Sequence, residues 1–180
     1  MVRDDSRNRQ KGSVEMGLFS KKQQKPAMSQ RVDPSLPDGE WMAASSNTYQ
    51  ANIEPYYGSP ETMAQGANDC LAIDDVGTAL FFYRKSIDIL HSQYLCIDPP
   101  RRDPNDADAA IVNGFVSTLR SVKSDHPSAP VDETVREVTH RFRTIAGHYQ
   151  RLGVAPDLYL NALNEMPSIA PEVDISTVLG

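Results

Sequence analysis

The sequence lacks the features that mark several classes of protein. Its longest unbroken apolar run covers residues 79–83, far short of the ~20 residues that a membrane-spanning helix needs. The ten glycines are dispersed, so there is no glycine-rich loop of the kind that binds phosphate. No segment alternates apolar and polar residues over a useful length, and we therefore expect no sheet. The N-terminal region has no apolar stretch typical of a secretory signal, which predicts a cytoplasmic protein.

Cysteine is scarce, since Cys70 and Cys96 are the only two. We expect them near opposite ends of two adjacent antiparallel helices, roughly 30 Å apart at 1.5 Å per residue, whereas a disulfide joins Cα atoms ~4.4–6.8 Å apart. Both are predicted to be free thiols, as is usual in a reducing compartment. Neither has a recognisable catalytic partner, so we interpret both as small buried hydrophobes.

Charge is unevenly distributed along the chain. Residues 1–30 carry seven Lys/Arg and three Asp/Glu, a net charge of +4, whereas residues 31–180 carry eleven and twenty-one, a net charge of −10. An acidic body repels phosphates, and duplex binding normally needs a basic face. We therefore expect no nucleic-acid partner, and we interpret the cations near the N-terminus as solubilising.

The first third of the chain has little apolar patterning. Residues 1–57 show no helical or strand period and are predicted to form a disordered arm, because such a composition buries too little apolar area to offset chain entropy. A sparse apolar string over residues 41–57 either covers the edge of the folded domain or binds a partner. Residues 1–15 are interpreted as an extension that results from a wrongly assigned translation start, since Met16 begins a segment typical of a natural chain start. Removal of residues 1–50 is expected to leave the thermal midpoint nearly unchanged.

Residues 58–165 carry the signals of a helical domain. Capping residues or prolines precede segments whose apolar residues recur at the helical spacing. The second segment has apolar residues on two faces, so it is predicted to be central. We predict an all-α fold, a compact bundle of four to five helices, followed by an irregular tail over residues 166–180. The expected helices cover about 60–72, 74–95, 106–123 and 131–152, with a short fifth helix that buries Leu158, Leu160 and Leu163.

The second predicted helix resembles the second helix of a tetratricopeptide repeat. Ala79, Tyr83 and Ser86 stand where that family places a small residue, an aromatic and another small residue, at the closest approach of its two helices. The resemblance covers about residues 59–92, a single unit, because the pattern does not recur at the family's period of about 34 residues. It implies a helical hairpin at the centre of the bundle and a protein-binding scaffold.

One candidate site is a metal centre. Glu137-Val138-Thr139-His140 is a Glu-x-x-His unit, which di-iron helix bundles repeat on two helices. His148 follows at a spacing of eight residues and faces roughly the same way. These side chains lie opposite the apolar stripe of their helix and are expected to point to solvent. A carboxylate and histidine metal-binding bundle, or a small helical enzyme, is therefore the alternative function.

The favoured function is a protein–protein interaction module without catalytic activity or cofactor, in the cytoplasm of a bacterium. Phe81 lies well off the main apolar stripe and is expected to stay partly open, whereas other segments of the chain are expected to cover Phe82 and Ile89. The partner is expected to be another protein. The candidate partner-binding residues are aromatics and cations: Phe81, Arg84, Lys85, Arg101, Arg102 and Trp41.

Overall fold

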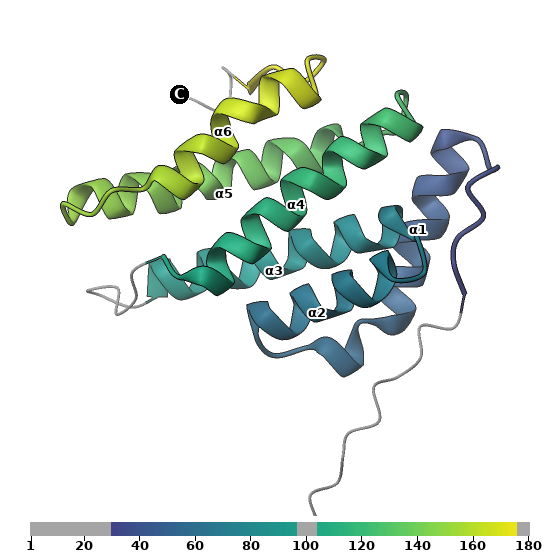
Figure 1. Cartoon of the computed structure of the whole chain (residues 1–180), viewed down its shortest axis with the longest axis horizontal. Helices are drawn as coiled ribbons and strands as arrows, with labels where there is room; N and C mark the ends of the chain where they lie inside the picture. Colours follow the sequence, from purple (N-terminus) through teal and green to yellow (C-terminus); the bar gives the residue numbers. More distant parts are fainter. Residues whose placement is uncertain (1–29, 97–103, 176–180) are drawn as a thin grey trace, which may run out of the picture.

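The structure, a computed structural model, describes residues 30–96 and 104–175, which form helices joined by loops (Figure 1). No strand occurs in these residues, which confirms the predicted all-α fold. The elements are α1 (Asp38–Asn52), the 3₁₀ helix η1 (Glu54–Tyr56), α2 (Pro60–Leu71), α3 (Val76–Cys96), α4 (Asp106–Asp125), α5 (Asp132–Arg151) and α6 (Asp157–Ile169).

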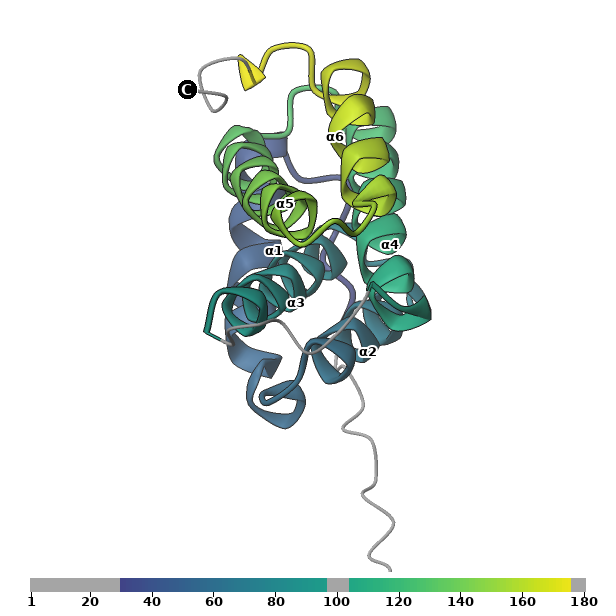
Figure 2. The same ribbon diagram turned by 90° about the vertical axis from the view of Figure 1, so that its left-hand side faces the viewer.

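The helix α3 lies at the centre, as its two apolar faces predict. Both α4 and α5 pack on α3, and α6 packs on α4 and α5, so these four helices close a ring (Figure 2). From outside this ring, α1 and α2 pack on α3. One helix therefore contacts four others and belongs to both groups.

Capping chemistry explains where the helices begin. The Ser59 hydroxyl accepts a hydrogen bond from the backbone N–H of the third residue of α2, at 3.1 Å. At the start of α3, the buried Asp75 carboxylate accepts the N–H and the hydroxyl of Thr78, at 3.1 and 2.8 Å. Asn105 and Asp108 form a capping box that starts α4. The predicted starts of these three helices are confirmed to within about two residues.

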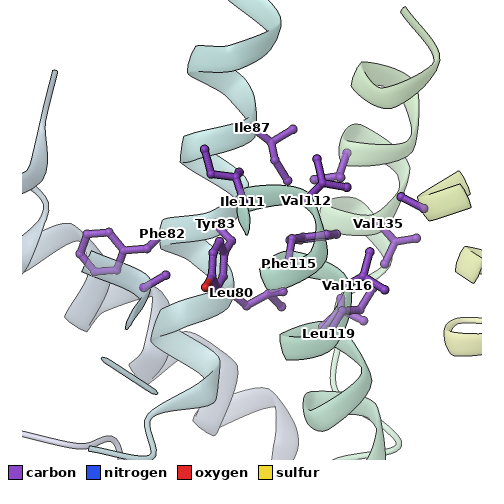
Figure 3. Packing of buried hydrophobic residues seen from close by; sticks show 14 of the residues in the cluster. Leu80, Phe82, Tyr83, Ile87, Ile111, Val112, Phe115, Val116, Leu119 and Val135 are labelled. Carbon is purple, nitrogen blue, oxygen red and sulfur yellow. The ribbon is translucent and has the colours of Figure 1, made fainter. Parts of the chain in front are cut away.

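A glycine allows α3 and α4 to pack closely against each other at Tyr83. A Cβ atom placed on Gly114 would lie 2.5 Å from the Tyr83 ring, so the two helices pack at this distance because residue 114 has no side chain. The Tyr83 hydroxyl donates a hydrogen bond to Asn68 Oδ1 of α2, at 2.9 Å. The ring of Tyr83 lies among buried side chains that include Leu80 and Phe115 (Figure 3). Tyr83 therefore joins α2, α3 and α4.

The helices α2 and α3 form an antiparallel hairpin, connected through residues 72–75. Ala79 and Ser86, the two small residues of the tetratricopeptide-like pattern, are fully buried. The Ser86 hydroxyl donates a hydrogen bond to the carbonyl oxygen of Pro60 at 2.6 Å, so the start of α2 is fixed to the middle of α3. On α2, a Cβ atom at Gly66 would lie 2.7 Å from the Phe82 ring. Small residues on both helices thus allow the hairpin to close.

The prediction of a disordered arm over residues 1–57 is wrong from residue 38 onwards, because α1 and η1 are helical and packed. Trp41, Met42 and Tyr49 are buried in the core, so the apolar string covers the edge of the domain. Periodicity missed α1 because its faces are not cleanly separated: Ser45 is buried, whereas alanines are exposed. Residues 1–29, with the interpretation of residues 1–15, lie outside the described residues.

The last helix differs from its prediction in length and in orientation. It continues to Ile169, so the predicted irregular tail is wrong over residues 166–169. Its three leucines are only partly buried, because another face of the helix packs against α4 and α5. Residues 176–180 lie outside the described residues. The buried residues of α6 are Tyr159, Ala162, Met166 and Ile169.

The substitution Tyr83→Ala is expected to lower the free energy of unfolding by ~3–5 kcal/mol, because it removes a large buried aromatic side chain. His140→Ala, at an exposed position of α5, is expected to change it by no more than ~0.5 kcal/mol. Chemical denaturation measures both values. A larger loss for His140→Ala than for Tyr83→Ala would contradict this account of the core.

Deletion of residues 1–50 is expected to lower the thermal midpoint by more than about 10 °C, because it removes Trp41, Met42 and Tyr49 from the core. This reverses the expectation from the sequence. Deletion of residues 1–29 keeps every described residue and serves as the control. Calorimetry compares the two proteins, and equal midpoints would show that α1 contributes nothing to the fold.

Candidate functional site

A groove with a volume of about 240 Å³ runs between α1 and α3. Its lining residues recur at spacings of three and four on each helix, so each set forms one helix face. We call it the α1–α3 groove. It brings together Phe81, Arg84 and Lys85, three of the predicted partner-binding residues. The lining residues are Ser46, Tyr49 and Gln50 of α1, and Phe81, Arg84, Lys85 and Asp88 of α3.

The floor of the groove is aromatic. The ring of Tyr49 stacks on Phe81 with 5.9 Å between centroids, and it meets Phe82 edge-on at 4.9 Å. Phe82 is fully buried, whereas Phe81 is only partly buried, so the predicted difference between these two residues is confirmed. Ile89 is partly buried rather than fully covered. Burial, together with the nearby Asp88 carboxylate, raises the pKa of the Tyr49 hydroxyl to about 12.

Two charged side chains that line the groove form ion pairs with side chains of α5. Arg84 of α3 pairs with Glu137 of α5, and Arg141 of α5 pairs with Asp88 of α3. Arg141 also lies 3.9 Å from the Glu137 carboxylate and donates a hydrogen bond to the Glu137 carbonyl oxygen at 2.9 Å. These side chains are 22–32% exposed, so water screens them only in part. The pairs hold Arg84 in place and neutralise Asp88.

Lys85 is the cation of the groove that lacks such a partner. Within the described residues, its ammonium group has no ion pair and no hydrogen bond, and its side chain is partly exposed. Its neighbours Ser46 and Gln50 offer hydroxyl and amide groups that donate hydrogen bonds. Because Arg141 neutralises Asp88, the groove is locally cationic on a chain whose residues 31–180 are strongly acidic.

The prediction that Trp41 binds a partner is wrong. Its side chain is only 2% exposed and stacks on His126 at the end of α4, with 3.9 Å between ring centroids. His126 Nδ1 lies 3.0 Å from the Asp38 carboxylate, so the same junction holds the first turn of α1. Gly77 allows α1 to pack closely on α3 at this point, because a Cβ atom there would lie 2.2 Å from Ser45 and 3.0 Å from the Trp41 ring. The predicted residues Arg101 and Arg102 lie outside the described residues.

The Glu-x-x-His unit does not assemble a metal centre in the part of the chain that the structure describes. Glu137 was expected to point freely to solvent, but it is partly buried because arginines on two helices pair with it. His140 is exposed, and His148 lies beside Arg151 with 3.5 Å between nitrogens. Across residues 30–96 and 104–175, no three His, Cys, Asp or Glu side chains are placed to hold a metal ion.

Cys70 is fully buried and has a free thiol, as predicted. Burial raises the pKa of this thiol far above its ordinary value, and the nearby carboxylates of Asp75 and Asp69 raise it further. A thiol with a raised pKa is a poor nucleophile at neutral pH, because the thiolate is the reactive form. The side chain of Cys96 lies outside what the structure describes.

Comparisons of the sequence with protein-family models and with curated proteins found no match, and comparison of the fold with solved structures found none either. Among the described helices, none is both long enough and apolar enough to cross a bilayer. The function is therefore inferred from the chemistry of the groove.

The raised pKa of Tyr49 predicts a loss of stability at alkaline pH. The unfolded chain releases this proton near pH 10.0 and the folded protein near about 12. The favourable contribution is therefore complete below pH 10 and is lost as the pH rises through about 12. Tyr49→Phe cannot ionise, so its unfolding free energy is expected to fall less between these values. Denaturant titrations measure the slopes, with Tyr57→Phe at an exposed site as the control; equal slopes for wild type and Tyr49→Phe would contradict the assignment.

Proposed function

We propose that the protein is a protein–protein interaction module, and that its α1–α3 groove binds an acidic segment of a partner protein. The observation that carries the proposal is the unpartnered ammonium group of Lys85 beside the partly open ring of Phe81. A cation next to an exposed aromatic surface suits a segment that carries a carboxylate and an adjacent apolar side chain. The proposal places the protein in the cytoplasm and gives it no catalytic role.

The chemistry of the groove favours a carboxylate. The ammonium group of Lys85 has three N–H donors and no acceptor, so its natural partner is an anionic oxygen. Ser46 and Gln50 on the opposite wall can donate further hydrogen bonds to a carboxylate that Lys85 binds. The volume of about 240 Å³ is below the ~300–1,000 Å³ that small-molecule sites usually have. The groove therefore suits a side chain of a peptide better than a cofactor.

The groove wall is ordered before a ligand arrives. Glu137 and Arg141 hold Arg84 and Asp88, while the rings of Tyr49 and Phe82 pack on each other in the core. Binding therefore orders few side chains besides Lys85, which limits the entropic cost of association. The acidic body repels an acidic partner at long range, but salt screens this repulsion beyond ~8 Å under physiological conditions. Recognition then depends on contacts inside the groove.

The test uses a synthetic peptide library in which one position is either Glu or Gln and the neighbouring position is apolar. Wild-type protein is expected to prefer the Glu peptides, measured by fluorescence anisotropy. Lys85→Met is expected to weaken their binding by about 1.4- to 5-fold, because a partly exposed ion pair contributes ~0.2–1 kcal/mol. Phe81→Asp is expected to fold normally and to bind the same peptides more weakly.

The matched control is Arg136→Met, which removes an exposed cation of α5 that is not among the groove residues. It should leave peptide binding unchanged. Equal binding of Glu and Gln peptides by wild type, or an equal loss for Lys85→Met and Arg136→Met, would overturn the role of Lys85. If Phe81→Asp failed to fold, the Phe81 ring would be part of the core, and the proposed binding surface would not exist.

A further inference from the structure

The helix α6 carries apolar side chains on a face that points away from the core. Leu160 and Leu163 are only partly buried, whereas residues on another face of the same helix are buried inside the four-helix ring. Together with Pro167, they line a hollow of about 750 Å³, which Val173 and Ile175 complete from the segment after α6. We call it the α6 hollow. A hollow with such a lining is favourable for an apolar occupant.

Charged groups at the rim of the α6 hollow already have partners. Glu172 pairs with Lys123, which lowers the pKa of the Glu172 carboxyl group. Arg143 and Asp174 also take part in interactions within the protein. A charged occupant would therefore find no free counter-charge among these groups and would lose hydration on entering an apolar space. The hollow thus favours a segment without charged side chains.

We propose that residues 176–180 of the same chain fill the α6 hollow, with Val178 and Leu179 packed against Leu160 and Leu163. This segment has the sequence Ser-Thr-Val-Leu-Gly and carries no charged side chain. It follows Ile175, which itself lines the hollow. The other segment outside the described ends, residues 1–29, carries seven Lys/Arg and does not match the rim.

The reach of this segment is sufficient. After α6 the chain turns back, so residues 171–175 line the same hollow as α6 (Figure 1). Five extended residues span about 16–18 Å at ~3.3–3.6 Å each. Leu160 and Pro167 are seven residues apart on α6, or about 10 Å at 1.5 Å per residue. Residues 176–180 are therefore long enough to reach along the apolar line of α6 from Pro167 to Leu160.

The test compares two double substitutions in the full chain. Val178→Asp with Leu179→Asp places two charges in the hollow and is expected to raise the fluorescence of the dye ANS at least ~2-fold, because apolar surface becomes exposed. The same variant should lower the thermal midpoint. Ser176→Asp with Thr177→Asp adds the same charge at the two polar positions and is the matched control, which should leave both readings near those of wild type.

A direct measurement keeps the proposal testable if the first variant fails to fold. In wild-type protein, methyl groups of Leu179 are expected to show nuclear Overhauser contacts with those of Leu160 or Leu163. Their absence, with equal dye fluorescence for both variants, would show that residues 176–180 do not fill the hollow. A fluorescence that falls with protein concentration, together with the mass of a dimer in sedimentation, would assign the hollow to a second copy and overturn the proposal.

Discussion

The contact of the Tyr83 ring with Gly114 is the constraint on which the rest of the structure depends. It sets the distance between α3 and α4, and the Tyr83 hydroxyl extends the contact to α2. Because α3 belongs both to the four-helix ring and to the outer pair α1 and α2, its spacing from each neighbour determines whether both groups can form at once. A second contact of this kind sets the distance between α3 and α2, where the ring of Phe82 packs on Gly66.

The groove forms on the face of α3 that the other helices do not cover completely. Its core faces are fully covered, so the remaining face, with Phe81 and Lys85, is the one that α1 leaves accessible. Tyr49 connects the two regions, because one ring contacts both the buried Phe82 and the groove residue Phe81. The ion pairs of α3 with α5 then fix the polar side of the groove at small cost, since partly exposed pairs need little desolvation. Stability of the core and order of the groove therefore have a common origin.

Local signals predicted most of the fold, and contacts between distant segments account for the rest. Helix starts at Ser59, Asp75 and Asn105 depend on side chains within three residues, so they could be read from the sequence. The helix α1 could not, because its buried face includes Ser45 and its stability comes from packing on α3. The orientation of Glu137 depends on arginines of two helices, and the buried face of α6 depends on the space between α4 and α5. Of the candidate site, Phe81, Arg84 and Lys85 were predicted, whereas Asp88 was missed, and Ser46 and Gln50 were missed together with α1. Tyr49 belonged to the apolar string whose role the sequence left open.

Trp41 is the only tryptophan of the chain, and its ring lies against the imidazole of His126. The intrinsic tryptophan emission of the protein therefore originates at a single junction, between the first turn of α1 and the end of α4. Detachment of α1 would transfer this indole to water and shift its emission while the four helices α3, α4, α5 and α6 are still folded. Tryptophan emission compared with far-UV circular dichroism, which reports the remaining helices, thus distinguishes loss of the outer helix from global unfolding without any label.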